Sequence, residues 1–259
     1  MNAPMSEFQQ LMLEGVLVEE QCRYGRMAFL RTDLYMAQSL GIYREFSESE
    51  IDVWRHFVRA GDTIVSAGAN TGAHIVWLAQ AVGKGGTVIT AEPQSLMHDI
   101  VRHNLEINDL HNVELHRLAL GDRGGNANIP KPDYRWPNNF GSAALVDSLA
   151  GTEKVEVATI DQLVGTRHVR MIHLDVEGHE AKALAGAWQT IERCKPILFV
   201  EIDREDQRNT VLKMLAGMRY EALQHFGPLY NPDNLAKVAT NVFGTTCSIN
   251  VLGLPRVPA

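Results

Sequence analysis

Acidic side chains and one imidazole gather directly after a short apolar stretch in the second half of the chain. The apolar stretch ends at Leu174, and Asp175, Glu177, His179 and Glu180 follow it. Carboxylates and imidazoles in such a position can take up or release a proton of a bound molecule, which is general acid–base chemistry. Asp175 is the first candidate for a catalytic group of this kind, or for a carboxylate that faces a cofactor. Glu177 and His179 are the second candidates.

Each of these residues also has an ordinary structural interpretation. For His179, a helix-entry position without a chemical role is preferred over catalysis, and Glu180 is better explained as an acid that stabilises the first turn of a helix. Glu201 ends the apolar stretch 197–200, and a charge at the end of a buried strand is costly unless it faces a cleft or a partner. Glu201 is therefore a further catalytic candidate, and Asp203 can share its role.

A glycine turn follows the first predicted strand of the main fold. Its sequence is Gly68-Ala69-Asn70-Thr71-Gly72. A dinucleotide site has the pattern G-x-G-x-x-G, in which the middle glycine lets a pyrophosphate approach the backbone at the start of a helix. Asn70 stands in that middle position, and no Gly-Lys-Ser/Thr follows, so the turn is neither a dinucleotide motif nor a P-loop. Alone, it indicates only a tight turn in an α/β protein.

The end of the next predicted strand makes the interpretation more specific. It has the sequence Ala91-Glu92-Pro93-Gln94. A carboxylate at this point can accept hydrogen bonds from both ribose hydroxyls of a nucleoside, and Pro93 stiffens the turn that aims it. On its own, Glu92 is equally a solvated acid or a helix-start residue. The turn and the acid together, without a phosphate-binding pattern, indicate a nucleoside cofactor that lacks a pyrophosphate, and S-adenosyl-L-methionine is the leading candidate.

The elements that position these residues alternate between strands and helices. This alternation predicts βαβ units and a mostly parallel sheet. Right-handed crossovers then bring the carboxyl ends of the strands to one edge of the sheet, where ligands bind. Strands are expected at 63–67, 87–91, 113–120, 155–158, 168–174, 197–201, 220–225 and 246–251, helices at 73–82, 95–108, 180–193 and 205–215, and irregular structure at 121–153.

The region before the first of these strands has a different character. Ser47 and Glu50 have the spacing of a helix capping box, a hydroxyl followed three residues later by an acid. Apolar residues then recur at helical spacing over residues 51–58. We therefore expect an N-terminal leader or helical cap over residues 1–58 and the main domain over residues 59–259.

The composition fits a well-buried α/β protein. The chain has 259 residues, of which 45% are apolar, and a formal net charge of −7 at pH 7. The negative charge argues against nucleic acid or an anionic membrane as partners.

Cys22, Cys194 and Cys247 are far apart, which disfavours a disulfide framework and fits a cytoplasmic protein. No apolar run is long enough for a membrane span, and residues 1–20 carry four glutamates and no basic cluster, so no signal peptide is expected.

A metal site is not expected from the sequence. Asp175, His179 and Glu201 can bind a hard divalent ion, but they follow no recognised ligand spacing. The remaining histidines that we weighed are interpreted as structural or surface residues rather than ligands: His111, His116, His168 and His173.

An ordered set of motifs runs through most of residues 35–255. The most specific is His173-Leu174-Asp175-Val176-Glu177-Gly178-His179-Glu180, followed by Leu184, Gly186, Pro196 and Glu201. The others, in chain order, are 43–48, 61–65, 68–74, 92–94, Asn108, 112–113, 119–122, 137–141, 231–234 and 241–244. With these motifs the chain resembles the FkbM-type methyltransferases. The resemblance implies a Rossmann-like class I methyltransferase fold, a mostly parallel seven-stranded sheet with helices on both faces and the last strand antiparallel. It also implies S-adenosyl-L-methionine as the methyl donor and a hydroxyl acceptor on a small molecule, such as a secondary metabolite or a sugar.

The resemblance also implies roles for individual residues. The turn with Gly68, Ala69, Asn70 and Gly72 would cradle the methionine part of the cofactor. Glu92 would hold the ribose with Pro93 and Gln94 beside it, the turn from Ala119 to Asp122 would line the adenine, and Asp175 would lie near the reacting sulfonium.

Two asparagines in the segment expected to be irregular are candidates for binding the acceptor substrate. Asn138 and Asn139 lie between Pro137 and Phe140. Polar loop residues near a cofactor often bind substrate. Ordinary turn chemistry, which Asn and Pro favour, explains the two residues equally well.

One position departs from the usual pattern of such methyltransferases. An acid commonly ends the first strand and helps to position the ammonium group of the cofactor, whereas this chain has Ser66. A serine can form a hydrogen bond but supplies no charge. We therefore expect weaker cofactor binding, or compensation from Glu45, Glu48 or Asp175.

Several alternatives to a small-molecule O-methyltransferase stay open. A non-catalytic relative that binds the cofactor and serves as an interaction subunit is favoured by Ser66, and an N-methyltransferase is a further alternative. A nicotinamide-dependent oxidoreductase is disfavoured by Asn70 in the turn. Exposed apolar faces on the leader helix would suit a homodimer.

Overall fold

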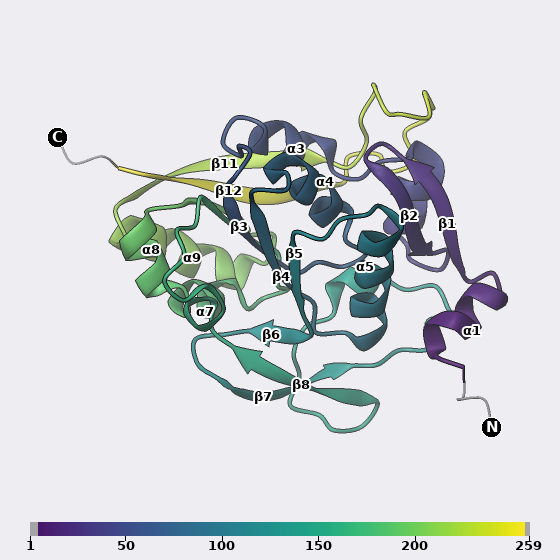
Figure 1. The fold of residues 1–259 in the computed structure, drawn as a ribbon, viewed down its shortest axis with the longest axis horizontal. Helices are drawn as coiled ribbons and strands as arrows, with labels where there is room; N and C mark the ends of the chain where they lie inside the picture. Colours follow the sequence, from purple (N-terminus) through teal and green to yellow (C-terminus); the bar gives the residue numbers. More distant parts are fainter. Residues whose placement is uncertain (1–4, 257–259) are drawn as a thin grey trace.

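A seven-stranded sheet forms the centre of the molecule (Figure 1). The computed structural model of the protein describes residues 5–256, so the outer ends of the two predicted parts, residues 1–4 and 257–259, lie outside it. The strands are β3 (Thr63–Ala67), β4 (Thr87–Ala91), β5 (Val113–His116), β9 (Met171–Leu174), β10 (Ile197–Glu201), β11 (Tyr220–Pro228) and β12 (Cys247–Pro255). In space they follow the order β11-β12-β10-β9-β3-β4-β5.

The pairing of these strands confirms the predicted sheet. The five strands from β10 to β5 run parallel to one another, and β12 is antiparallel to both of its neighbours. The central parallel strands are nearly continuous apolar runs because both faces of the sheet are covered. The register places Ser66 in the middle, between Thr90 on one side and His173 on the other.

Helices cover both faces of the sheet, as predicted. On one face, α3 (Glu48–Trp54), α4 (Ala73–Val82) and α5 (Ser95–Ile107) pack on the sheet through a core that contains Trp54 and Phe199. The other face carries α6 (Ile160–Val164), α7 (Glu180–Ala185), α8 (Trp188–Cys194) and α9 (Glu205–Gly217). Each large apolar side chain buried in these two layers stabilises the fold by roughly 1.5–3 kcal/mol.

The single helix predicted over 180–193 is wrong, because α7 and α8 are separate helices. The break lies at Gly186, whose carbonyl accepts a hydrogen bond from the Asp161 amide at 2.9 Å. A Cβ atom at Gly186 would lie only 2.0 Å from the carbonyl oxygen of Gly121. This close approach of two backbones requires glycine and interrupts the helix.

A small second sheet lies beside the central one and is seen below it in Figure 1. It consists of β6 (Leu118–Leu120), β7 (Gly125–Pro130) and β8 (Thr152–Ala158), in the order β6-β8-β7. The single strand predicted over 113–120 is wrong, because the chain leaves the central sheet at Arg117. The prediction of irregular structure over 121–153 is wrong at β7, which pairs antiparallel with β8. The same segment also contains a short 3-10 helix, η2 (Phe140–Ser142).

The N-terminal region contains a β-hairpin that the sequence analysis missed. It follows α1 (Glu7–Leu13) and consists of β1 (Leu17–Cys22) and β2 (Gly25–Leu30). Two amide side chains, one in α5 and one on the residue that follows it, complete the edge of β2. Asn104 accepts a hydrogen bond from the Ala28 amide and donates one to its carbonyl, at 2.6 and 2.9 Å. Asn108 bonds Arg26 in the same way, at 3.0 and 2.7 Å, so the hairpin is fixed to α5.

The predicted capping box before α3 is wrong. Two short elements precede that helix, α2 (Met36–Gln38) and the π-helix η1 (Ser39–Tyr43). Ser47 then has a left-handed backbone, with φ 48° and ψ 46°, and its side chain makes no capping hydrogen bond. Glu50 instead turns toward β12, where its Oε1 accepts hydrogen bonds from Ser248 Oγ at 2.5 Å and from Asn250 Nδ2 at 3.0 Å. Tertiary contacts therefore replace the local cap.

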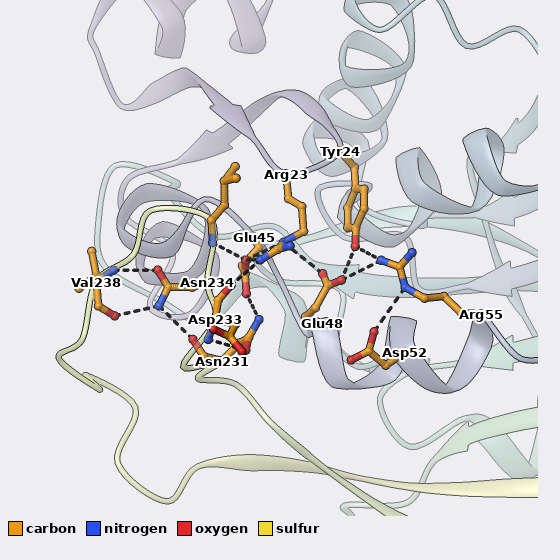
Figure 2. Close-up of polar contacts among 11 residues, drawn as sticks. Arg23, Tyr24, Glu45, Glu48, Asp52, Arg55, Asn231, Asp233, Asn234 and Val238 are labelled. Carbon is orange, nitrogen blue, oxygen red and sulfur yellow. Dashed lines mark hydrogen bonds and ion pairs between the residues drawn. The ribbon is translucent and has the colours of Figure 1, made fainter.

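A network of ion pairs within the N-terminal region is joined by hydrogen bonds to the loop between β11 and β12 (Figure 2). Arg23 contacts Glu45 at 2.6 Å and Glu48 at 3.7 Å, and Arg55 contacts Glu48 at 2.9 Å. Glu45 also accepts a hydrogen bond from Asn231 Nδ2 at 2.8 Å.

None of the helices in the described part of the chain is long and apolar enough to cross a membrane.

Candidate active site

A cavity of about 260 Å³ lies at the carboxyl ends of β3, β4, β9 and β10. The strand order reverses at this edge of the sheet, which is where open α/β sheets bind ligands. The volume is close to the lower end of the roughly 300–1,000 Å³ of small-ligand pockets. The predicted site residues that line the cavity are Gly68, Asn70, Glu92, Pro93, Gln94, Ala119, Asn139, Asp175, Glu177, His179 and Glu201.

The turn between β3 and α4 has the backbone conformation that its glycines permit. Gly68, Asn70 and Gly72 all have positive φ, at +82°, +51° and +84°. A Cβ atom at Gly68 would lie 1.7 Å from the carbonyl oxygen of Asp175. The absence of a side chain at Gly68 therefore lets the ends of β3 and β9 meet, and this contact brings the turn beside Asp175.

This geometry predicts the effect of filling the position. Gly68→Ala is expected to destabilise the protein strongly and to abolish binding of S-adenosylhomocysteine, the product form of the cofactor. Gly61→Ala is the matched control, because Gly61 has φ +90° but nothing within 4 Å of its ideal Cβ. Both variants carry the left-handed backbone cost of roughly 1–2 kcal/mol. Urea unfolding and calorimetry compare them, and equal losses would show that the contact with Asp175 is not needed.

Glu92 lies at the end of β4 and faces the turn. Its side chain is buried, with Oε2 accepting a hydrogen bond from the Asn70 amide at 2.9 Å and Oε1 accepting one from the Gln94 amide at 3.0 Å. Burial raises the pKa of Glu92 to about 7, and the two backbone donors oppose that rise. Each carboxylate oxygen keeps further acceptor capacity, so the group can receive two more hydrogen bonds from a ligand.

Unpaired acceptors beside Glu92 fit S-adenosylmethionine. Asn70 Oδ1 and Gln94 Oε1 are buried and have no hydrogen-bond partner among the described residues, and both side chains line the cavity. Buried acceptors of this kind are costly unless a ligand supplies donors. The ribose hydroxyls and the ammonium group of S-adenosylmethionine are such donors, whereas a pyrophosphate would bring further acceptors and negative charge. The residues present therefore fit a nucleoside cofactor without a pyrophosphate.

Asp175 and Glu201 form a half-buried carboxyl pair in the same cavity. They follow β9 and end β10, and each offers a carboxylate oxygen within 4.8 Å of the other. Burial raises the pKa of Asp175 to about 8. Burial, together with the neighbouring Asp175, raises the pKa of Glu201 well above its ordinary value. Two like charges this close cannot both ionise readily, so the pair holds one proton between them.

The other acids of this loop have firm structural partners. Glu177 lines the cavity, but its Oε2 accepts a hydrogen bond from Arg204 Nη2 at 2.6 Å. Glu180 Oε1 accepts hydrogen bonds from the backbone amides of Val176 and Gly178, at 3.2 and 3.0 Å. Glu180 is also the first residue of α7, as expected for a first-turn acid. His179 precedes α7, is half-buried and lines the cavity.

Four predicted site residues do not line the cavity: Ser66, Ala69, Gly72 and Asn138. Ser66 is fully buried inside the sheet, and its Oγ is hydrogen-bonded to His173 Nδ1 at 2.9 Å. Asn138 is exposed, and its carbonyl accepts a hydrogen bond from the Leu34 amide at 3.0 Å. Its neighbour Asn139 lines the cavity. The next residue, Phe140, fixes this segment beside the β4 end, because its carbonyl accepts a hydrogen bond from Gln94 Nε2 at 2.9 Å.

Two of the three acids suggested as substitutes for a charged residue at position 66 are engaged elsewhere. Neither Glu45 nor Glu48 lines the cavity, and both pair with arginines (Figure 2). Asp175 does line it, directly across from Gly68.

The structure adds lining residues that sequence reasoning missed. Asp33, Glu50 and His74 line the cavity and come from the N-terminal region and from α4. Asp33 is buried, and burial raises its pKa. His74 follows the glycine turn directly, and its place in the first turn of α4 is the one signal that could have identified it.

A family model described as the methyltransferase FkbM domain matches residues 66–225, which is more than half of the chain. The match includes the glycine turn, Glu92, Asp175 and Glu201, and it ends within β11. A comparison with curated protein sequences finds no match.

Solved structures share the fold at low sequence identity. An S-adenosylmethionine-dependent O-methyltransferase from Thermotoga maritima has a TM-score of 0.51 and 15% identity, covering 93% of this chain and 79% of that chain. A putative rRNA methylase from Clostridium thermocellum has a TM-score of 0.50 and 14% identity, covering 81% of this chain and 96% of that chain. An FkbM methyltransferase from Methylobacillus flagellatus KT has a TM-score of 0.49 and 16% identity, covering 78% of this chain and 50% of that chain. This chain therefore spans about half the length of that FkbM protein.

Three findings agree with one another. They are the sheet order with its antiparallel last strand, the cavity lined by hydrogen-bond acceptors, and the match of the family model over residues 66–225. The chain belongs to the FkbM methyltransferase family and is an S-adenosylmethionine-dependent methyltransferase.

Proposed function

We propose that the enzyme transfers the methyl group of S-adenosylmethionine to a hydroxyl of a small molecule. The observation that carries this proposal is the Asp175–Glu201 carboxyl pair, which lies in the same cavity as the glycine turn and Glu92. When bound, the cofactor supplies a methyl group activated by its sulfonium charge. A hydroxyl acceptor must in addition lose its proton, which requires a general base within hydrogen-bond reach.

The residues of the chain divide this work between binding and proton transfer. Glu92 would hold the two ribose hydroxyls, and the free oxygens of Asn70 and Gln94 would receive further donors of the cofactor. These residues would position the cofactor for methyl transfer, and positioning is the main catalytic contribution to such a reaction. The Asp175–Glu201 pair already holds one proton, so its remaining carboxylate takes up the proton of the acceptor and both carboxyls are then protonated.

The charge of the cavity indicates the chemical class of the acceptor. Its lining contains seven acids and, among the described residues, neither lysine nor arginine: Asp33, Glu50, Glu92, Asp175, Glu177, Glu201 and Asp203. Such a surface repels phosphate groups and offers acceptors to hydroxyl and ammonium donors. This charge favours a neutral or cationic small molecule over a nucleic acid or a phosphate ester.

The N-terminal region completes the acceptor side of the cavity. Asp33, Met36, Phe46 and Glu50 lie in its lining and belong to the predicted leader, residues 1–58. We infer that this leader acts as a cap on the domain of residues 59–259 and helps to select the acceptor.

Transfer of label from S-[methyl-³H]adenosylmethionine to a panel of acceptors tests the proposal. The panel contains neutral polyols and phenols, amino alcohols, phosphorylated sugars and total RNA. We expect methyl ethers of neutral or cationic hydroxyl compounds as products. Labelled amines would establish N-methylation, and label found only in RNA or phosphate esters would contradict the acceptor class. Binding of S-adenosylhomocysteine without any transfer would favour the non-catalytic alternative.

A further inference from the structure

We propose that Glu50, His74 and His173 form a binding site for one divalent transition-metal ion, such as Zn²⁺, in the wall of the cavity. The three residues come from α3, from α4 and from β9. Each offers one ligand atom, and these atoms all lie within 4.8 Å of one another. Two imidazoles and one carboxylate are a ligand set that suits zinc, iron, cobalt and nickel rather than magnesium or calcium.

The distances between the side chains leave room for an ion but little else. His74 Nε2 lies 3.7 Å from Glu50 Oε2, too far for a hydrogen bond and close to the separation of two ligands that each bind one ion at about 2.0–2.2 Å. The rings of His74 and His173 are 5.7 Å apart and nearly perpendicular. Trp54 packs against both rings, with distances between ring centroids of 4.7 Å to His74 and 4.8 Å to His173, and holds them in place.

The charge of Glu50 lacks the compensation that its neighbours have. Glu45 and Glu48 are paired with arginines, as Figure 2 shows. Glu50 is just as buried, but its partners among the described residues are the neutral Ser248 and Asn250 and, 3.7 Å away, His74. Buried charges in proteins are paired or coordinate metals. A cation at this point would supply the missing partner.

Each imidazole has a ring nitrogen that is available to an ion. His74 Nε2 is buried and has no hydrogen-bond partner. His173 is oriented through Nδ1 by Ser66 Oγ, and when Nδ1 donates this bond the opposite nitrogen is free to bind an ion. Metal-binding histidines almost always have such a second partner, which gives Ser66 a positioning role.

The site is open to the cavity. Glu50 and His74 both line it, so an ion can enter there and can also contact an acceptor bound in it. A bound ion lowers the pKa of an oxygen that it coordinates. This second role, activation of the acceptor hydroxyl, rests on the proposed O-methylation, whereas binding of the ion does not.

Metal binding is tested on the full chain, stripped with EDTA and titrated with Zn²⁺ by calorimetry. We expect one Zn²⁺ per chain and no binding of Mg²⁺ at the same concentration. Co²⁺ in place of Zn²⁺ should give visible absorption bands from nitrogen and oxygen ligands. A wild-type protein that binds no Zn²⁺ would overturn the proposal, with no variant involved. Such a failure leaves methyl transfer untouched, and absent methyl transfer with bound Zn²⁺ leaves the metal site standing.

Variants locate the ion. His74→Ala and the near-isosteric Glu50→Gln are expected to lower Zn²⁺ affinity by more than about 100-fold, since loss of a ligand costs at least as much as loss of its supporting hydrogen bond. The control is Glu177→Gln, which removes one member of the other carboxylate cluster, Asp175, Glu177 and Glu201. Retained affinity in Glu177→Gln supports the site. Affinity lost in Glu177→Gln and kept in His74→Ala would place the ion on the carboxylates and overturn it. Thermal unfolding shows that each variant is folded.

Discussion

Replacing Glu92 by glutamine is expected to lower the affinity for S-adenosylhomocysteine by about 100-fold or more. The carboxylate holds the Asn70 and Gln94 amides and has capacity for two ribose hydroxyls. Hydrogen bonds to a charged group contribute about 1.5–3 kcal/mol each, and a loss of about 3 kcal/mol corresponds to more than 100-fold in the dissociation constant. Glutamine also places an NH₂ group against backbone N–H donors, so the turn loses an acceptor as well.

Calorimetry with S-adenosylhomocysteine measures this loss. Glu153→Gln is the matched control, because Glu153 lies near Glu92 but does not line the cavity. The control should bind with nearly wild-type affinity. Unchanged affinity in Glu92→Gln would show that the ribose is held elsewhere.

The same carboxylate predicts how binding and stability depend on pH. Burial raises the pKa of Glu92 to about 7, so cofactor affinity should fall as the pH drops from 8 to 6 and the group becomes protonated. The stability of the free protein should change in the opposite direction. A raised pKa means that the folded state holds the proton more tightly, so stability is lost as the pH rises from about 4.5 to about 7.

Replacing Asp175 by asparagine is expected to lower kcat by about 10²–10⁴-fold while the affinity for S-adenosylhomocysteine changes less than about tenfold. Asp175 lies at the turn that holds the cofactor and shares a proton with Glu201. Asparagine keeps the shape of the side chain but cannot accept the proton of the acceptor. The backbone of Asp175, which meets Gly68, remains in place, and the cofactor site should therefore survive.

Two further variants separate the roles within this group. Glu201→Gln should lower kcat in a similar way, because the two carboxyls act as a pair. Glu177→Gln should have a smaller effect, because its carboxylate is already held by Arg204 at 2.6 Å. Steady-state rates with an acceptor identified by label transfer measure all three. If Asp175→Asn and Glu201→Gln both keep full kcat, the carboxyl pair is not the base.

The part of the site that the sequence predicts lies within single strand–turn units. The turn from Gly68 to Gly72, Glu92 and Asp175 each follow a strand, and parallel strands bring their ends to one edge, so their convergence can be argued without coordinates. The mostly parallel pairing of the central strands follows from the same alternation. These features depend on local patterns and on one general rule of chain topology.

The parts that the sequence did not predict depend on contacts between distant segments. Glu50 has the spacing of a capping residue, but Ser248 and Asn250, about 200 residues away in the chain, take its side chain instead. The hairpin of β1 and β2 is likewise completed by Asn104 of α5 and by Asn108, which follows that helix. No local rule indicates these partners. For the same reason Glu50, His74 and His173, which match no ligand spacing, come together only in the folded chain.

A crystal structure of the protein with S-adenosylhomocysteine tests the central assignment most directly. It should show both ribose hydroxyls hydrogen-bonded to the Glu92 carboxylate, the homocysteine part over the turn of Gly68 to Gly72, and the sulfur facing Asp175. A ligand bound away from Glu92, or with its sulfur turned away from the Asp175–Glu201 pair, would contradict it.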